Sequence, residues 1–306
     1  MSTSVSFIHI ETSADVGQRL DNYLHRELKG VPRSHVYKIL RSGEVRVNGK
    51  RARAGYRIQL GDQLRIPPIR TRKEVPTTVS AHTEDVLRRA VLHEDEDIIV
   101  LNKPAGFAVH GGSSVSAGVV EAMRVVFANP RLELVHRLDR GTSGCLLLAK
   151  RPQTLRQLQA AFRSRDIKKV YHLVVWGRWP RRLSRVDLRL RRYETAWGER
   201  RVRVASDGQS ASTDFRVLEH QDRASRLEAV LHTGRTHQIR VHTSASGHPI
   251  VGDDKYGGVP QQSSLNRLCL HAQRLQIPDP SRPGSVLKFN APVPDEIDRI
   301  WSEITA

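Results

Sequence analysis

The chain has 306 residues, 38% of them hydrophobic, which fits about two domains with a substantial core. It carries 50 Lys and Arg against 32 Asp and Glu, and its net charge of +18 favours a polyanionic partner, most often nucleic acid. A generally arginine-rich proteome is the alternative explanation. Two cysteines, Cys145 and Cys269, exclude a disulfide framework or a four-cysteine zinc site.

No apolar stretch of the sequence approaches the roughly 20 residues that span a membrane. The first residues, 1–11, also lack the basic and apolar regions of a signal peptide. We therefore expect a soluble, cytoplasmic protein.

The positive charge is concentrated near the N-terminus. Residues 17–73 hold 15 Lys or Arg and 4 Asp or Glu, a surplus of 11 positive charges in a net total of 18. Charge this uneven indicates a dedicated binding module.

The basic segment also has the pattern of a folded module. Apolar residues at helical spacing predict one helix over 20–28 and a second that starts at Pro32 and Ser34 and ends at Gly43. Alternating apolar residues then run into Asn48-Gly49, which predicts a β-hairpin. The polar face of this module carries Arg33, Lys38, Arg41, Arg46, Lys50, Arg51 and Arg53.

This layout resembles the S4 RNA-binding domain, above all over residues 41–50, Arg-Ser-Gly-Glu-Val-Arg-Val-Asn-Gly-Lys. The resemblance implies an RNA-binding domain over 15–67, and a proline-rich linker follows over 68–80. A basic helix end beside a basic hairpin can bind backbone phosphates without reading bases. The alternative is that these charges form only a solvated surface.

Strand-like segments dominate the rest of the chain, from residue 81 to residue 306. They cover 98–101, 132–135, 145–148, 170–176, 227–231 and 268–275. Helical stripes of apolar residues are limited to 155–162 and 297–304. Because strands outnumber helices and do not alternate regularly with them, we predict an α+β domain with a mixed sheet.

The common cofactor and metal motifs are missing from the sequence. No Gly-x-Gly-x-x-Gly and no Walker-type loop occurs, so we expect neither a dinucleotide nor an NTP as cofactor. His232, His237 and His242 are five residues apart, whereas ligands on one helix face are four apart. We expect no metal site there.

A polar turn lies between two apolar strands in the stretch 132–150, and it contains His136, Arg137, Asp139 and Arg140. An acidic residue between two arginines, in a loop held by buried strands, is positioned for chemistry on an anionic ligand. These residues alone leave the interpretation open, because a turn Asp often bonds nearby backbone amides instead.

Residues 136–144, His-Arg-Leu-Asp-Arg-Gly-Thr-Ser-Gly, resemble the signature of the RluA family of pseudouridine synthases. The likeness continues at 101–106, 109–112, 169–171, 233–242, 252–257 and 268–272, and with the S4-like module it covers about 15–304. It implies a mainly antiparallel catalytic domain over 81–306. It also implies a cofactor-free enzyme that isomerises specific uridines in 23S ribosomal RNA to pseudouridine.

The resemblance also assigns roles to individual residues. Asp139 would be the nucleophile, Arg235 the guanidinium that pairs with it, and Tyr171 the residue that stacks on uracil and handles the C5 proton. Arg137 would fill the place of a flipped uridine, whose unstacking costs about a few kcal/mol. His136 would only support the motif. Whether Asp139 attacks the base or the sugar stays open, and nothing demands more than a monomer.

Two other classes of function also stay open. A non-catalytic RNA-binding or ribosome-assembly protein would use the basic module alone, and Asp139 would be dispensable. A metal-dependent nuclease that uses His and Asp residues would lose its activity with chelators.

Overall fold

The computed structural model describes residues 5–11, 15–28, 30–31, 33–69, 79–111, 117–257 and 267–306, without the Arg33 side chain. The chain divides into two compact units, Met1–Thr77 and Thr78–Ala306. Most of the expected linker 68–80 lies outside the described residues, so the domain boundaries stay a prediction. Among the described helices, none has the length and apolarity needed to cross a membrane.

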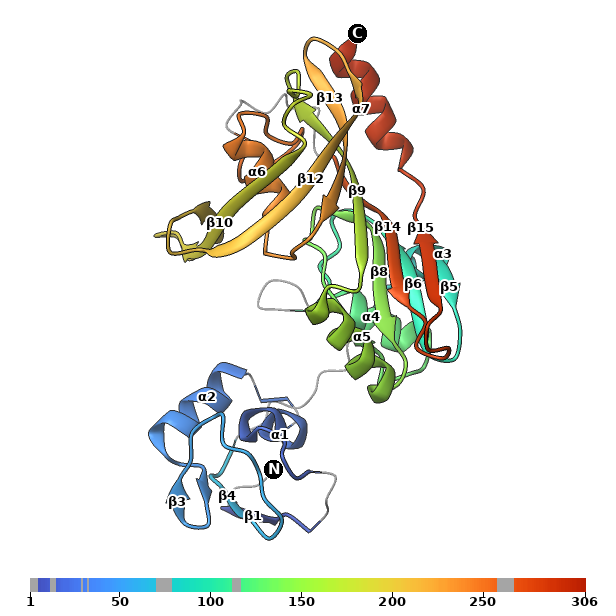
Figure 1. The fold of residues 1–306 in the computed structure, drawn as a ribbon. Helices are drawn as coiled ribbons and strands as arrows, with labels where there is room; N and C mark the ends of the chain where they lie inside the picture. The colour runs from blue at the N-terminus through green and yellow to red at the C-terminus, as the bar shows by residue number, and fades with distance from the viewer. Residues whose placement is uncertain are drawn as a thin grey trace. The chain divides into compact units, whose positions relative to one another are not determined.

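The first unit combines two helices with a small antiparallel sheet (Figure 1). Its helices are α1 (Leu20–Glu27) and α2 (Arg33–Ser42), and its strands are β1 (Ser6–His9), β2 (Arg46–Val47), β3 (Lys50–Arg51) and β4 (Gln63–Ile66). The strand order is β1-β4-β2-β3. Apolar stripes of both helices share one buried cluster with residues of β2 and β4. Both predicted helices are confirmed, while the expected helix start at Pro32 lies outside the described residues.

The predicted hairpin at Asn48-Gly49 is also confirmed. Asn48 and Gly49 have φ angles of 50° and 74°, as the two central residues of a tight type I′ turn require. The turn joins β2 to β3, and it therefore sets their basic residues side by side.

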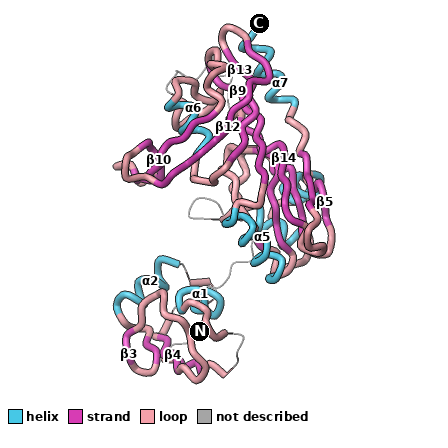
Figure 2. The backbone as a smooth tube through the Cα atoms, in the orientation of Figure 1, coloured by secondary structure: helices cyan, strands magenta, loops and turns pink. Residues whose placement is uncertain are grey.

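The second unit is built on one sheet of eleven strands, drawn in magenta in Figure 2. The strands are β5 (Val91–Glu94), β6 (Ile98–Lys103), β7 (Glu133–Leu134), β8 (Ser143–Ala149), β9 (Lys168–Trp176), β10 (Arg185–Glu194), β11 (Arg200–Val204), β12 (Gln209–His220), β13 (Ala224–Leu231), β14 (Leu270–Pro278) and β15 (Val286–Asn290). The main path runs β11-β10-β12-β13-β9-β14-β8-β6-β5, with β15 on β14 and β7 on β8. Only β8 and β14 pair in parallel among the described strands. The mixed, mainly antiparallel α+β fold is confirmed.

The described part of this unit contains five helices: α3 (Ala81–Arg89), α4 (Val119–Val126), α5 (Pro152–Ser164), α6 (Gln238–Ala245) and α7 (Asp295–Thr305). The two expected helices are α5 and α7. Figure 1 shows α7 beside β13, which it contacts through a buried face that includes Trp301. Helix α6 contacts the long strands β10, β11 and β12.

Strand β8 is the buried support of the loop that contains Asp139. All seven of its residues are buried, and it pairs with β6 on one side and β14 on the other. Gly144 in β8 has a φ of +109°, and a Cβ there would lie 2.3 Å from the Ala272 carbonyl oxygen. Only glycine fits this close approach. Cys145 and Cys269 are buried free thiols.

Candidate active site

The Asp139 loop joins β7 to β8, and its backbone is fixed by the neighbouring loop after β6. The Gly106 N–H donates to the Arg140 carbonyl over 2.8 Å, and the Arg140 Nε donates to the Gly106 carbonyl over 2.9 Å. The Thr142 N–H closes the turn onto the Asp139 carbonyl over 3.1 Å. These bonds occupy backbone groups and leave the Asp139 side chain 24% exposed.

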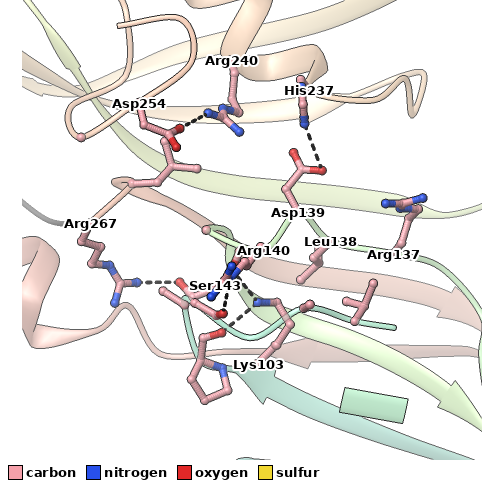
Figure 3. A pocket seen from close by; sticks show the side chains of 18 of the residues that line it. Lys103, Arg137, Leu138, Asp139, Arg140, Ser143, His237, Arg240, Asp254 and Arg267 are labelled. Atoms are coloured by element: carbon pink, nitrogen blue, oxygen red, sulfur yellow. Dashed lines mark hydrogen bonds and ion pairs between the residues drawn. The ribbon is translucent and has the colours of Figure 1, made fainter. Parts of the chain in front are cut away.

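The Asp139 carboxylate accepts no hydrogen bond from the described backbone of its own turn. Among the described residues, no backbone amide donates to its oxygens. Within the described ranges its one close polar contact is to His237, whose Nε2 lies 3.8 Å from Oδ1 (Figure 3). The interpretation of Asp139 as an ordinary turn residue that binds amides therefore does not fit.

Two cavities adjoin this carboxylate, with volumes of about 520 and 1360 Å³. Both are lined by Arg137, Leu138, Asp139, His237 and Arg240. The smaller one has the size of a small-molecule site, and the larger one exceeds that range. Asp139 thus lines both a compact cavity and a larger cavity whose lining includes several cationic side chains.

Tyr171 lies on β9 and lines the smaller cavity with Asp139. Its side chain is buried, and burial together with the negative charge of Asp139 raises the pKa of Tyr171 above its usual value of 10.0. At neutral pH the group is therefore a phenol that can donate a hydrogen bond. The structure brings together the expected nucleophile and the expected aromatic residue.

Arg235 lies elsewhere than expected, and its predicted pairing with Asp139 is not observed. Its side chain is exposed, and its Nε donates to the Ser210 carbonyl over 3.2 Å, with no ion pair to Asp139 among the described contacts. The reason is local: residues 233–236 form a turn before α6. The Arg235 N–H in this turn donates to Gln238 Oε1 over 3.0 Å.

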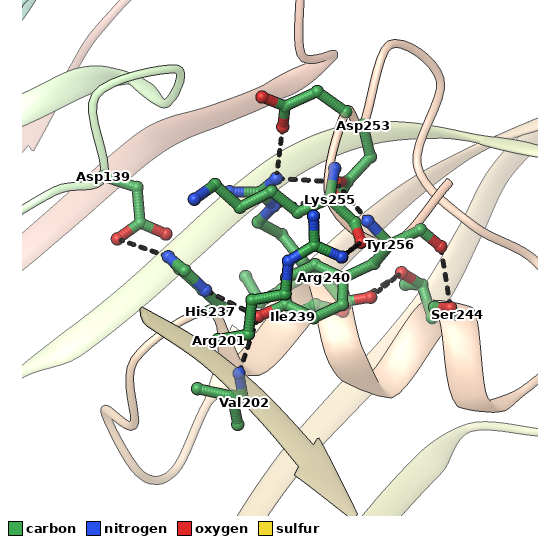
Figure 4. Close-up of polar contacts among 12 residues, drawn as sticks. Asp139, Arg201, Val202, His237, Ile239, Arg240, Ser244, Asp253, Lys255 and Tyr256 are labelled. Atoms are coloured by element: carbon green, nitrogen blue, oxygen red, sulfur yellow. Dashed lines mark hydrogen bonds and ion pairs between the residues drawn. The ribbon is translucent and has the colours of Figure 1, made fainter. Parts of the chain in front are cut away.

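The guanidinium near Asp139 belongs to Arg240, which the sequence analysis missed. Arg240 lies in α6 and is only 5% exposed. Its Nε and Nη2 donate to the two carboxylate oxygens of Asp253 over 2.8 and 2.6 Å (Figure 4), and Nη2 also donates to Asp254 over 2.9 Å (Figure 3). This bidentate clamp holds a cation beside Asp139 without a direct bond to it. The only sequence signal was its place in the segment 233–242.

Lys103 binds backbone carbonyls of the Asp139 loop and of the neighbouring loop after β6. It is fully buried, and its Nζ donates to the carbonyls of Pro104, Phe107 and Arg140 over 2.8, 3.0 and 3.3 Å. Burial lowers the pKa of Lys103 to about 7, although the charge of Asp139 opposes this shift. The sequence analysis named Lys103 only as part of a motif.

Of the two residues before Leu138, Arg137 lies on the surface and His136 packs inside the domain. Arg137 is exposed at the mouth of both cavities, and its guanidinium makes no hydrogen bond or ion pair within the part of the chain that the structure describes. His136 accepts the Leu147 N–H over 3.1 Å and stacks on Phe162 at 4.9 Å. Burial lowers the pKa of His136 to about 4, so its ring is neutral support.

The three evenly spaced histidines have separate surroundings. His232 bonds Asp214, His237 faces Asp139, and His242 is fully buried. Over the described ranges, no group of three His, Cys, Asp or Glu side chains could hold a metal ion.

The basic residues expected to bind RNA lie on the surface of the first unit. Lys38, Arg41, Arg46, Lys50 and Arg51 are all exposed. Arg51 Nη2 donates to the Ser42 carbonyl over 2.7 Å, which ties the hairpin to the end of α2. Nothing is described of the Arg33 side chain.

Comparisons with known proteins agree with this architecture. The family model for RNA pseudouridylate synthase matches residues 97–245, and the model for the S4 domain matches residues 18–64. Among solved structures, Human RNA Pseudouridylate Synthase Domain Containing 4 is similar, with a TM-score of 0.60 and 26% identity over 72% of this chain and 95% of that one. Human RNA Pseudouridylate Synthase Domain Containing 1 has a TM-score of 0.56 and 28% identity over 66% and 82%.

Curated relatives match over nearly the whole length. Ribosomal large subunit pseudouridine synthase C of Escherichia coli is 44% identical over 98% of this chain and 97% of its own. The proteins of that name from Pasteurella multocida and Haemophilus influenzae are 45% and 42% identical, over 94% and 99% of this chain and 90% and 96% of theirs.

Proposed function

The chain belongs to the RNA pseudouridylate synthase family, and we propose that it isomerises specific uridines of 23S ribosomal RNA in the large subunit, with Asp139 as nucleophile. Its relatives over almost the full length are called ribosomal large subunit pseudouridine synthase C. The S4 domain supplies an exposed basic surface for the same substrate class. Ribosomal RNA, free or in the assembling subunit, is the proposed partner of a cytoplasmic monomer.

The isomerisation of uridine to pseudouridine requires a nucleophile and a proton acceptor from the enzyme. The N1–C1′ bond of uridine breaks, a C5–C1′ bond forms, and the C5 proton is removed while N1 gains one. No electrons or groups are exchanged with a second substrate. A carboxylate held at a cavity, together with one proton acceptor, is therefore sufficient for covalent catalysis of this type.

The observation that carries the proposal is the state of the Asp139 carboxylate. It is partly exposed at the junction of two cavities and free of backbone donors among the described residues. The Arg240 guanidinium also lines both cavities and places a positive charge near this carboxylate. In this proposal Arg240, and not Arg235, supplies the guanidinium that acts on Asp139.

Two further residues complete the proposed site. Tyr171 would stack on the extruded uracil in the smaller cavity. Because its hydroxyl is protonated at neutral pH, it can receive the C5 proton only if its own proton leaves in the same step. Arg137, exposed at both cavities and without a partner in the described structure, would fill the gap left by the flipped nucleotide.

The nucleophile can be tested with Asp139→Asn, which keeps the size of the side chain and removes its charge. We expect the RNA affinity and the thermal unfolding temperature to be unchanged, whereas pseudouridine formation falls to background. Tritium release from RNA labelled at C5 of uridine measures the reaction. Asp222→Asn, at an exposed turn, is the matched control. Isomerisation by Asp139→Asn at the wild-type rate would contradict the assignment.

The substrate is tested separately by mapping pseudouridines in 23S ribosomal RNA with and without the gene. We expect specific sites to revert to uridine in the deletion strain. An unchanged map would contradict the proposed substrate, although it would leave the enzyme class untouched.

A further inference from the structure

A chain of polar contacts reaches Asp139 from the far side of His237 (Figure 4). The His237 Nε2 faces Asp139 Oδ1 over 3.8 Å, and its Nδ1 lies 2.7 Å from the hydroxyl of Tyr256. The Val202 N–H in turn lies 2.9 Å from the same hydroxyl oxygen. Three residues from separate segments thus form a line that ends at the carboxylate.

The direction of the hydrogen bonds along this line is fixed by its first member. The Val202 backbone N–H can only donate, so the Tyr256 oxygen accepts there. Burial raises the pKa of Tyr256 to about 12, which keeps its proton in place. That proton is then available to His237 Nδ1. A neutral imidazole that accepts at Nδ1 carries its own proton at Nε2.

The surroundings of His237 favour this neutral ring. The charged groups that face it are Asp139, Arg240, Lys255 and Asp253. Burial lowers the pKa of His237 below its usual value, and the two cations act in the same direction, against the two carboxylates. At neutral pH an uncharged N–H therefore points at Asp139.

The backbone supports a dedicated role for this side chain. His237 immediately precedes α6 and has a φ of 52°, in the left-handed region that few non-glycine residues adopt. Gln238 holds the turn in place through its bonds to Thr213 and Ser212 over 2.9 and 3.0 Å. Strained residues of this kind are concentrated at functional sites.

We propose that His237 is a positioning residue for the nucleophile, and that Tyr256 sets the tautomer in which its Nε2–H orients the Asp139 carboxylate. The proposal rests on the proposed function of Asp139. The 3.8 Å separation is longer than a hydrogen bond, and it shortens when uridine occupies the cavity, because catalytic contacts tighten in the substrate complex. A neutral donor orients the carboxylate without neutralising the charge that attacks.

The tautomer can be measured without substrate by ¹⁵N NMR of the histidine side chains. We expect the His237 proton at Nε2 in the wild-type protein. In Tyr256→Phe the donor to Nδ1 is lost, so the ¹⁵N shifts of His237 should move toward a mixture of tautomers. A wild-type proton at Nδ1, or identical spectra of the two proteins, would overturn the proposal.

Two substitutions of His237 separate positioning from a structural role. Gln places an amide N–H near the position of Nε2, whereas Asn reaches only as far as Nδ1 but suits the left-handed backbone better. We expect the single-turnover rate to fall about 100-fold in His237→Asn, the effect of losing one oriented donor, and His237→Gln to recover most of it. The RNA dissociation constant should stay the same in both. A merely structural role predicts the opposite order, with Asn the milder change.

The outcomes distinguish this proposal from the function on which it rests. If the wild-type protein forms no pseudouridine, the proposed function fails, while the NMR result still decides the tautomer. If the wild type is active and His237→Asn equals His237→Gln, the positioning role alone is wrong.

Discussion

At the scale of single residues, Lys103 shows how a buried charge makes stability depend on pH. Its folded pKa of about 7 lies below its ordinary value of 10.5. Between these values the unfolded chain binds a proton that the folded protein has released, so the free energy of unfolding rises with pH. Below pH 7 both states are protonated, and the cost of burying the ammonium is present in full.

We therefore expect the unfolding free energy of the wild-type protein to increase from pH 7 to pH 9. Lys103→Met should remove this part of the slope, because no proton is then exchanged at the site. Denaturant titrations at each pH measure both. Parallel slopes in the two proteins would show that Lys103 does not titrate in this range.

Tyr171 allows a second prediction at the same scale. Tyr171→Phe keeps the ring that lines the smaller cavity and removes only the hydroxyl. If that hydroxyl takes part in proton transfer, the maximal rate should fall about 100-fold or more while the RNA dissociation constant changes little. Quenched-flow assays with tritiated RNA give the rate. A full rate in Tyr171→Phe would restrict the role of this residue to stacking.

The sequence alone could not decide which arginine of the segment 233–242 lies near Asp139. The resemblance links this segment to Asp139 through Arg235, whereas in the structure His237 and Arg240 of the segment line the cavities beside Asp139. The two differ because α6 begins at Gln238. Arg235 precedes the helix and turns outward to Ser210, whereas Arg240 lies within it and turns inward to Asp253. No local sequence pattern predicts the start of α6, so the position of Arg235 outside the helix and of Arg240 inside it became clear only from the structure.

At the scale of secondary-structure elements, the predictable segments were those whose pattern is set by burial. Strands β6, β8 and β9 are nearly all buried, and their apolar runs were recognised. Strands β10 and β11 are rich in exposed arginine and were missed. Helix α6 was also missed, although it is buried. It buries polar residues such as Gln238, Arg240 and His242 and therefore has no apolar stripe. The element that carries much of the site was thus the hardest to predict.

The close pairing of β8 with β14 gives a prediction for these elements. Gly144→Ala adds a methyl group 2.3 Å from the Ala272 carbonyl oxygen, in addition to the strain of a positive φ. Gly247→Ala is a matched control, because Gly247 also has a positive φ but nothing lies within 4 Å of the added atom. We expect Gly247→Ala to destabilise by about 1 kcal/mol and Gly144→Ala by about 1–3 kcal/mol more. Thermal unfolding measures both, and equal losses would contradict the close approach.

At the scale of the whole molecule, the chain combines a basic RNA-binding unit with a catalytic unit. Lys38, Arg46 and Lys50 are exposed on the first unit. If each neutralises one phosphate, replacing all three with Ala should lower the slope of log affinity against log salt by about 2–3. Fluorescence anisotropy with a 23S ribosomal RNA fragment at several salt concentrations measures this slope.

The matched control for that experiment removes the same charge from exposed positions near the C-terminus. Arg282, Lys288 and Arg299 are exposed cations of the second unit. Their replacement with Ala should change the salt slope much less. If both triple variants had the same slope, general attraction by net charge would explain binding, and the S4 domain would have no special part in it.

The order in which the site is encoded has a consequence during translation. Asp139 is synthesised long before His237 and Arg240, which line the same cavities in the folded enzyme. A nascent chain that ends before His237 contains Asp139, the proposed nucleophile, but lacks His237 and Arg240. The proposed site is therefore incomplete until α6, and the Asp253 that binds Arg240, have also been synthesised.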